Sequence, residues 1–340
     1  MINHLYRLTS PFLIERCCSE INLQDKNHLI VQPKKLSICK ADMRYYFGLR
    51  DAAVLEKRLP MALIHEACGE VLYDPNGIFQ KHQKVVLLPN IGGTDDFYLE
   101  NYRLDSIFRS SKADGFMQEL VSISPDQVVS YQRNGYDDVF AFTEFISVGV
   151  HAVDSFSKIS HNRRNHICVF GDGALSYVVS SVLKKKLPHT KITVMGKHPS
   201  KLQYFTFVDK TINVNYQKPK AEYDHAFECT GGSGCAKAIN QIIDIIHPQG
   251  TIMLLGVSEE PVAINTRIVL EKGLTLMGRS RSGKKDFEQA VEMITTDRVF
   301  ASRMKHLISE KIDVAFINDI SRAFDLAQTV DFKVIMNWLM

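Results

Sequence analysis

The chain has 340 residues, of which 45% are hydrophobic and 23% are charged, and its formal net charge is +3. This composition is ordinary for a globular protein and excludes a disordered or fibrous chain, and the length allows two domains with separate cores. The mild positive charge does not require a nucleic-acid partner, because the basic residues are dispersed and lack interleaved aromatic residues.

The N-terminal segment and the cysteine content favour a cytoplasmic location. Residues 1–10 lack the apolar core of a signal peptide. The longest apolar stretch, 139–153, carries Glu144 and His151 and is too short to span a bilayer, so no membrane association is expected. Seven cysteines without a secretion signal are typical of a reducing compartment rather than of a disulfide framework.

The first 150 residues are dense in Pro, Gly, Asn and Asp and contain short alternating runs, which predicts a mostly β domain. The tail at 285–340 combines a helical pattern with a last apolar segment, and we expect it to rejoin this domain. The predicted organisation is therefore one domain from 1–150 and 285–340, interrupted by a second domain at 151–284.

The second domain alternates short apolar runs with helical patterns. The runs lie at 166–170, 191–195, 211–214, 223–229, 251–255 and 274–277. They are rich in Val and Ile and do not alternate with polar residues, as expected for strands that are buried on both faces. Helical spacing follows the first and the fourth run, and this order predicts an α/β fold with a doubly wound parallel sheet of the Rossmann type.

A glycine-rich turn directly follows the first of these runs. Gly171 permits a tight turn, and Gly173 allows the backbone to approach a pyrophosphate at the start of a helix that begins with Ala174 and Leu175. Ser176 stands at the third glycine position and is small enough for close packing of helix on strand. Because strand, turn and helix occur in the required order, the segment predicts a dinucleotide site rather than an ordinary turn.

The second run ends in Gly196, Lys197 and His198, where an NAD site usually has an acidic residue for the ribose 2′-hydroxyl. A carboxylate there would repel a 2′-phosphate, whereas Lys197 can neutralise it. The sequence therefore favours NADPH, with Gly196 and Lys197 in the site. A solvated lysine at a strand end is the alternative interpretation.

Cys39, His65, Glu66 and Glu144 offer thiolate, imidazole and carboxylate ligands in the N-terminal half. Three protein ligands and one open position are typical of catalytic zinc. Their spacing alone is weak support, because Cys39 could be a small buried hydrophobe, His65 a core histidine and Glu144 a helix-start carboxylate.

Five motifs occur in one fixed order. They lie at 37–42, 64–66, 114–119, 143–152 and 224–232. This is the order in which the zinc-dependent medium-chain alcohol and polyol dehydrogenases carry them, and the chain resembles that family over nearly its whole length. The resemblance implies a GroES-like catalytic domain holding the Rossmann domain as an insertion. It also implies that Cys39, His65 and Glu66, with Glu144 as a fourth group, surround one catalytic zinc.

More narrowly, the chain is similar to the bacterial ribulose-5-phosphate reductases (ribitol-5-phosphate 2-dehydrogenases). The segments that carry this similarity include ADMRYYFGLRD, LPMALIHE, FRSSKADGFMQE and NTRIVLEKGLTLMG. The resemblance implies reduction of D-ribulose 5-phosphate by NADPH, which supplies CDP-ribitol for cell-wall teichoic acid. It also suggests a homodimer that works with a separate ribitol-5-phosphate cytidylyltransferase.

Two departures from the wider family and one geometric requirement bear on the chemistry. Residues 89–114 contain no Cys, so a second, structural zinc is not expected. Ala41 replaces the Ser or Thr that relays the alcohol proton, and water held by Glu66 or Glu144 becomes the expected donor. Because neighbouring side chains of a strand face opposite sides, His65 and Glu66 can share a metal only if the chain bends, and we treat the two glutamates as exchangeable ligands.

A phosphosugar needs cations away from the metal. Arg44 and Arg109 are our candidates because a guanidinium binds phosphate through two parallel hydrogen bonds, and the hydroxyls of Ser110 and Ser111 could assist. Lys40 is expected to meet a cofactor phosphate. The alternative for each cation is a solvated surface charge.

Three other functions remain open on the sequence. The first is a dehydrogenase of an unphosphorylated polyol, and the second is a zinc-free quinone or enoyl reductase, which the presence of Cys39 and His65 disfavours. The third is a non-enzymatic redox or ligand-binding protein that uses Cys17 and Cys18.

Overall fold

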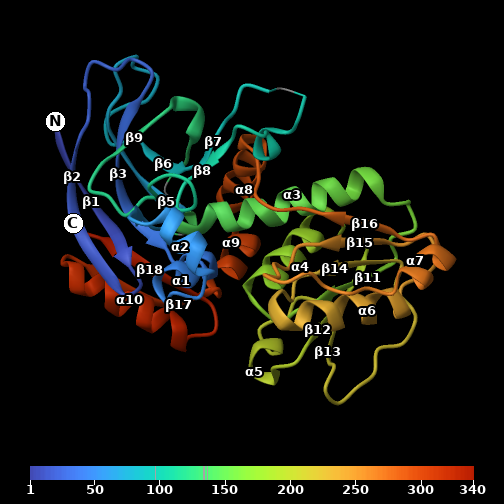
Figure 1. Ribbon diagram of the computed structural model, residues 1–340. Helices are drawn as coiled ribbons and strands as arrows, with labels where there is room; N and C mark the ends of the chain where they lie inside the picture. Colours follow the sequence, from blue (N-terminus) through green and yellow to red (C-terminus); the bar gives the residue numbers. More distant parts are fainter. Residues whose placement is uncertain (96, 133–134, 136) are drawn as a thin grey trace. The chain divides into compact units, whose positions relative to one another are not determined.

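The computed structural model describes residues 1–95, 97–132, 135 and 137–340. The chain forms two compact units, one made of Met1–Ser147 with Ser282–Met340 and the other of Val148–Arg281. The division falls within helix α3 (Thr143–Ile159), and Figure 1 shows each unit in the colours of the sequence.

The first unit is built on β-sheets. A sheet in the order β10-β6-β5-β3-β18-β17, with β9 also paired to β3, is its largest, beside a β2-β1-β4 sheet and a β7-β8 pair. The strands are β1 (Ile2–Ser10), β2 (Leu13–Glu20), β3 (Leu29–Ser37), β4 (Met61–Ala62), β5 (Glu66–Tyr73), β6 (Lys84–Leu87), β7 (Asn90–Ile91), β8 (Ile107–Phe108), β9 (Val121–Ile123), β10 (Val128–Ser130), β17 (Ile308–Val314) and β18 (Lys333–Trp338).

The C-terminal tail belongs to this sheet. Strand β18 pairs antiparallel with β3, with Met336 opposite Leu36, and both side chains are fully buried. The helices of the unit, apart from α3, are α1 (Lys40–Tyr46), α2 (Ala52–Arg58), α8 (Lys284–Thr296), α9 (Arg298–Lys305) and α10 (Ile317–Thr329), with 3₁₀ turns η1 (Glu100–Tyr102), η2 (Pro125–Gln127) and η3 (Val139–Phe142). Phe324 of α10 stacks on Tyr46 of α1 and closes the core from the helical side.

The second unit is a six-stranded parallel sheet in the order β13-β12-β11-β14-β15-β16. Its strands are β11 (His166–Phe170), β12 (Lys191–Gly196), β13 (Lys210–Asn213), β14 (His225–Glu228), β15 (Thr251–Leu254) and β16 (Thr275–Gly278). Its helices are α4 (Ala174–Lys186), α5 (Pro199–Leu202), α6 (Cys235–Ile245) and α7 (Thr266–Lys272), with the turn η4 (Gly232–Gly234).

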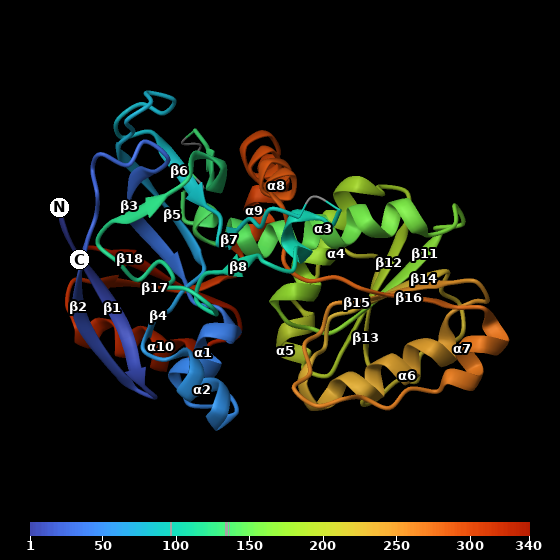
Figure 2. The same cartoon turned by 45° about the horizontal axis from the view of Figure 1, so that its top comes forward.

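Each predicted strand of this domain is present within a few residues of its expected position. The strand order reverses between β11 and β14, and α6 and α7 lie on one face of the sheet with α4 on the other (Figure 2). Ile167, Cys168 and Val169 of β11 are fully buried, as both-face coverage requires. The predicted doubly wound α/β fold class is confirmed.

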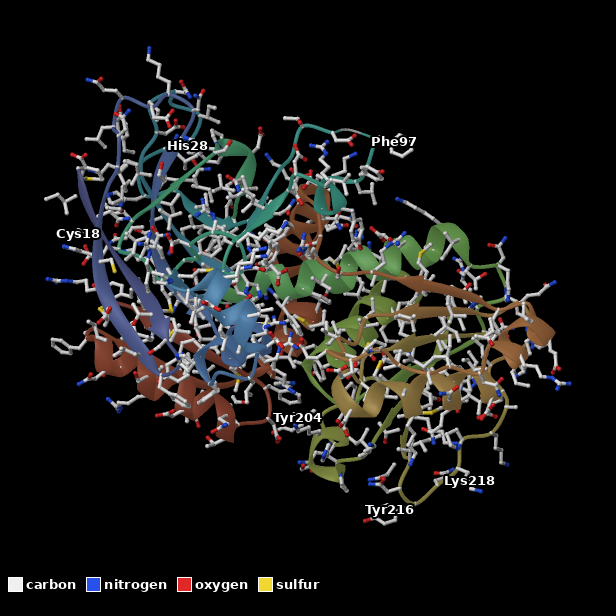
Figure 3. The ribbon with its side chains drawn as sticks, viewed as in Figure 1. Cys18, His28, Phe97, Tyr204, Tyr216 and Lys218 are labelled. Carbon is white, nitrogen blue, oxygen red and sulfur yellow. The ribbon has the colours of Figure 1, made fainter. Side chains whose placement is uncertain are left out.

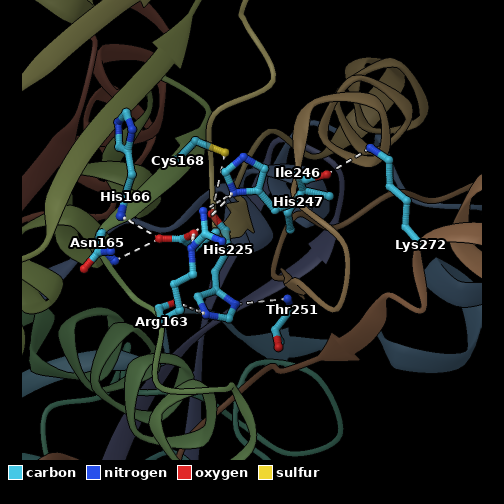
Figure 4. Close-up of polar contacts among 10 residues, drawn as sticks. Arg163, Asn165, His166, Cys168, His225, Ile246, His247, Thr251 and Lys272 are labelled. Carbon is cyan, nitrogen blue, oxygen red and sulfur yellow. Dashed lines mark hydrogen bonds and ion pairs between the residues drawn. The ribbon is translucent and has the colours of Figure 1, made fainter.

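A buried polar cluster closes the amino ends of this sheet (Figure 4). Asp224 accepts the backbone N–H groups of Asn165 and His166 and forms an ion pair with Arg163 at 2.7 Å. Beside it, His225 Nδ1 accepts the N–H of Thr251, so the proton of the neutral ring lies on Nε2, which donates to the carbonyl of Arg163. Burial lowers the pKa of His225 to about 4.

Among the described residues, one helical stretch, Val139–Ile159, is long and apolar enough to cross a bilayer. The expectation that the apolar stretch at 139–153 is too short to do so was therefore wrong in length, because the helix extends to Ile159. Within the test window, 83% of its residues are buried inside the protein. A buried core helix passes the same test of length and composition, and this degree of burial favours that interpretation.

Several side chains point outward from the two units (Figure 3). Cys18 is exposed on the edge strand β2, and Tyr216 and Lys218 are exposed in the loop that follows β13. All seven cysteines of the chain are free thiols.

Candidate functional site

The proposed metal ligands come together in the first unit. Potential ligand atoms of Cys39, Asp42 and His65 lie within 4.8 Å of one another, and so do those of His65, Glu66 and Glu144. His65 belongs to both sets, which makes it the centre of the cluster. Segments that are far apart in the sequence thus form one cluster of thiol, imidazole and carboxylate groups.

Asp42 links the first two segments of this cluster. Cys39 is the N-cap residue of α1, and its backbone N–H donates to Asp42 Oδ2. The other oxygen, Oδ1, accepts the N–H of Ile64 at 3.0 Å and lies 3.2 Å from His65 Nδ1. A single buried carboxylate therefore fixes the start of α1 against the histidine. Asp42 ends the SICKAD motif but was not among the predicted site residues.

A turn directly before β5 positions His65. Ile64 has a φ of +71°, which is uncommon for a β-branched residue, and it redirects the chain so that His65 and Glu66 reach the same cluster. The bend that the predicted metal site required is therefore present.

The GFM sequence at 115–117 holds this turn. The N–H groups of Gly115, Phe116 and Met117 donate to the carbonyls of Ala62, Ile64 and Leu63, respectively. A Cβ on Gly115 would lie 2.3 Å from two of these oxygens, so only glycine allows this approach.

Ser110 also contacts the histidine. Its Oγ lies 2.8 Å from His65 Nδ1, and binding of substrate phosphate by this hydroxyl stays a prediction. Burial disfavours the charged imidazole, yet Asp42 and Cys39 raise the pKa of His65 well above its ordinary value. Because Nδ1 faces Asp42 and Ser110, Nε2 is the nitrogen available to a metal.

The two glutamates differ in their surroundings. Lys333 of β18 donates to both carboxylate oxygens of Glu66, at 2.6 and 2.7 Å, and both side chains are buried. The lysine also lies over the Phe145 ring at 4.1 Å. Despite burial, Glu66 and Cys39 raise the pKa of Lys333, so the pair is ionic. The lysine gave no signal in the sequence.

Glu144 has no such partner. Among the described residues its carboxylate interacts with nearby charges but accepts no hydrogen bond, although it is buried. Burial raises the pKa of Glu144 to about 7, against the opposing effect of His65. A buried carboxylate without a donor, next to an imidazole and a thiol, fits a divalent cation such as zinc.

The cationic candidates occupy different surroundings. Arg44 is half-buried near the end of α1, and burial together with the charge of Arg50 lowers its pKa. Arg109 is more deeply buried, and its guanidinium donates to the carbonyls of Asp114 and Ser122. Burial lowers the pKa of Arg109 to about 10. Lys40 is exposed in the first turn of α1.

The glycine-rich turn in the second unit has the predicted geometry. Gly171 has a φ of +123°, and a Cβ there would lie 2.9 Å from the carbonyl oxygen of Cys229. Gly173 is the N-cap residue of α4. A Cβ built on it would meet no atom within 4 Å, so the space beside the start of this helix is open. Ala174 and Leu175 begin the helix, and Ser176 is fully buried with its Oγ donating to the Gly173 carbonyl at 2.7 Å.

Comparison with known proteins agrees with this arrangement. Residues 189–296 match the zinc-binding dehydrogenase family. The chain is 43% identical to a ribulose-5-phosphate reductase of Streptococcus pneumoniae, covering 99% of this chain and 98% of the relative. The chain belongs to the ribulose-5-phosphate reductase family.

A second relative and two solved structures show similar agreement. Ribulose-5-phosphate reductase 1 of Staphylococcus aureus is 43% identical over the full length of both chains. The crystal structure of S. aureus TarJ in complex with NADPH matches with a TM-score of 0.89 at 39% identity, covering all of both chains. L-Idonate 5-dehydrogenase of Escherichia coli shares the fold, with a TM-score of 0.86 at 20% identity.

Proposed function

We propose that this chain reduces D-ribulose 5-phosphate to D-ribitol 5-phosphate with NADPH, using one zinc ion per chain. The observation that carries the proposal is the full-length identity of 41–43% to ribulose-5-phosphate reductases of three genera. The two ligand groups that share His65, one with Cys39 and Asp42 and one with Glu66 and Glu144, support it, because thiol, imidazole and carboxylate groups suit a catalytic zinc.

The first unit would perform the catalysis. Cys39 Sγ, His65 Nε2 and Glu144 would hold the metal, and Glu66 would stay paired with Lys333 beside it. When bound, zinc supplies a Lewis acid that polarises the substrate carbonyl. Because Ala41 has no hydroxyl, a water molecule held by the carboxylate of Glu66 or Glu144 would deliver the proton to the alkoxide oxygen.

The second unit would bind the nucleotide, which is the hydride donor. Gly171, Gly173, Ala174 and Leu175 would hold its pyrophosphate at the start of α4, because backbone N–H groups point outward from a helix N-terminus. Gly196 and Lys197 would lie beside the adenosine 2′-phosphate, and Lys40 would meet a cofactor phosphate.

Arg44 would bind the phosphate of the sugar. It lies on the same short helix as the Cys39 cap and close to the charge of Arg50, so an anion nearby would relieve the repulsion between the two guanidinium groups. Arg109 remains a predicted second contact, although two backbone carbonyls already engage its guanidinium.

The decisive experiment is NADPH oxidation with D-ribulose 5-phosphate, before and after removal of metal by a chelator. We expect activity that is lost on chelation and restored by zinc, with NADH a poorer donor. Unphosphorylated D-ribulose should be a poor substrate, and equal turnover of the two sugars would instead favour a polyol dehydrogenase. Full activity of metal-free protein would overturn the proposed chemistry.

The cellular setting is also proposed. The product would serve a separate ribitol-5-phosphate cytidylyltransferase in the cytoplasm, and so the synthesis of CDP-ribitol for teichoic acid. We further propose a homodimer, as the family resemblance implies. Sedimentation of the purified chain, alone and with the cytidylyltransferase, would test both associations.

A further inference from the structure

The carboxyl end of β12 has a glycine where a ribose-binding acid is common, yet a carboxylate from another segment lies at this position. A Cβ built on Gly196 would be 2.5 Å from Asp172 Cβ and 2.6 Å from Asp172 Oδ2. Asp172 comes from the glycine-rich turn itself, between Gly171 and Gly173. The two segments are thus packed so closely that residue 196 cannot gain a side chain unless Asp172 moves.

The oxygens of Asp172 are already engaged. Oδ2 accepts the backbone N–H groups of Lys197 and His198, each at 2.7 Å, and lies 3.0 Å from His198 Nδ1. The side chain is only 13% exposed. Although burial opposes ionisation, hydrogen bonds from His198 and Lys197 lower the pKa of Asp172 below its ordinary value. The carboxylate is therefore ionised and directed at the strand end rather than at solvent.

This contact orients the His198 ring. Its side chain is 61% exposed, and among the described residues only Nδ1 is engaged, so Nε2 remains available to a ligand. Lys197 is exposed next to it, and a Cβ built on Gly234 would lie 3.8 Å from Lys197 Nζ. The carbonyl of Lys197 accepts hydrogen bonds from the side-chain amides of Asn213 and Asn215, which fix the backbone between Lys197 and His198.

We propose that His198, oriented by Asp172, is a second cationic contact for the 2′-phosphate of NADPH beside Lys197, and that this pair sets the preference for NADPH over NADH. The inference rests on the proposed function, because it deepens the nucleotide preference assigned there. Asp172 acts as a positioning residue: its charge is matched by three N–H donors and does not face the phosphate.

The chemistry of the ring suits this role. A protonated imidazole donates from both nitrogens, so one N–H serves Asp172 and the other is free for a phosphate oxygen. A charge-assisted hydrogen bond to phosphate is stronger than a neutral one, and a ring held in place loses less freedom on binding. The opposite arrangement, in which Asp172 accepts the ribose 2′-hydroxyl, would favour NADH.

Two nucleotide fragments that differ only in the 2′-phosphate isolate this contact. Calorimetric titration would compare 2′,5′-ADP with 5′-AMP for the wild type, His198→Gln and the control His189→Gln, whose histidine is exposed elsewhere in the same unit. We expect His198→Gln to weaken 2′,5′-ADP binding about tenfold, roughly one charge-assisted hydrogen bond, and to leave 5′-AMP unchanged. An equal effect on both fragments, or on neither, would overturn the proposal.

Asp172→Asn tests the positioning role. We expect it to weaken 2′,5′-ADP binding severalfold in the wild type and to have no further effect in the His198→Gln background, because it acts through that ring. Independent effects of the two substitutions, or tighter binding of 2′,5′-ADP to Asp172→Asn, would overturn it.

Fragment binding to the wild type distinguishes a failure of the proposed NADPH preference from a failure of the role assigned to His198. If the wild type binds 2′,5′-ADP no better than 5′-AMP, the NADPH preference of the proposed function fails. If it prefers 2′,5′-ADP but His198→Gln keeps the whole preference, the inference about His198 fails alone.

Discussion

The two units build their sites in different ways. In the second unit, strand β11, the Gly171–Gly173 turn, α4 and the end of β12 follow one another within 166–198, so the proposed nucleotide site is local in sequence. In the first unit, Cys39, His65, Glu144 and Lys333 come from four separate segments. A local site can be inferred from spacing, whereas a site assembled from distant segments needs the fold. The two sites should accordingly respond to different mutations.

Loss of a metal ligand should distinguish the two units most clearly, because it should affect the chemistry of the first unit and not nucleotide binding by the second. Cys39→Ala is expected to remove zinc and to lower kcat/KM by a factor of about 10⁴, since Lewis-acid stabilisation contributes several kcal/mol. NADPH binding to the second unit should persist. Metal analysis, turnover and NADPH fluorescence would measure these effects.

Cys68→Ala is the matched control. Burial raises the pKa of the Cys68 thiol to about 12, so it is a neutral core group, and the variant should keep its zinc and most of its activity. Zinc retention by Cys39→Ala would show that the cluster is not the metal site.

Removal of Lys333 should affect the stability of the first unit. Lys333→Met leaves the buried Glu66 carboxylate unpaired, and we expect a loss of about 3–5 kcal/mol in the free energy of unfolding. Urea unfolding followed by the fluorescence of the single tryptophan, Trp338, would measure it. The double variant with Glu66→Gln should recover much of the loss.

Lys311→Met provides a surface comparison, because Lys311 pairs with Asp138 at 3.1 Å and is 52% exposed. This substitution should lower the free energy of unfolding by less than about 1 kcal/mol. Similar losses from both lysine substitutions would contradict the role of the buried pair.

The second unit should show its own dependence on pH. The folded pKa of His225 lies near 4, below its ordinary value of 6.5, so the neutral ring stabilises the fold above pH 6.5. This contribution, about 3 kcal/mol at most, is lost as the pH falls from 6.5 to 4. Urea unfolding at several pH values, followed by circular dichroism, should show a shallower decline for His225→Gln than for the wild type.

For that measurement His189→Gln is the control, since its ring is exposed in the same unit. Its stability should follow the wild type at every pH. Parallel curves for His225→Gln and the wild type would argue against a neutral buried ring.

The smallest expected effect concerns Ser176. Ser176→Ala removes the hydrogen bond to the Gly173 carbonyl but keeps the small size, so we expect a loss of about 1 kcal/mol in stability and an unchanged NADPH affinity. Ser180→Ala is the matched control, because among the described residues the buried Ser180 hydroxyl has no partner. A large drop in NADPH affinity for Ser176→Ala would assign the hydroxyl, rather than the size, a part in binding.

Periodicity and turn chemistry were enough to predict the parallel sheet. Its strands are short runs rich in apolar residues, and Gly171 stands where the backbone must turn. The absence of an acidic residue at position 196 could also be read from the sequence. What could not be foreseen is that Asp172 packs there, because this depends on the distance between two loops.

Less of the proposed metal site could be predicted. The ligand types were recognisable mainly through the family resemblance, and the bend at Ile64 was required but not locatable. Lys333 is one of many lysines in the sequence, and only the pairing of β18 with β3 brings it to Glu66. The contact of the Ser110 hydroxyl with His65 could not be foreseen either, because the two residues are 45 positions apart in the sequence.

The position of Lys333 has a consequence for biosynthesis. It is translated 267 residues after Glu66, so the ion pair cannot form while the ribosome is still making the parallel sheet. The second unit, whose strands are contiguous in the chain, can fold as it emerges, whereas the Glu66 carboxylate must wait for β18. During that interval the nascent protein would carry an acid without its cation, and early capture of a metal ion there would be one way to neutralise it.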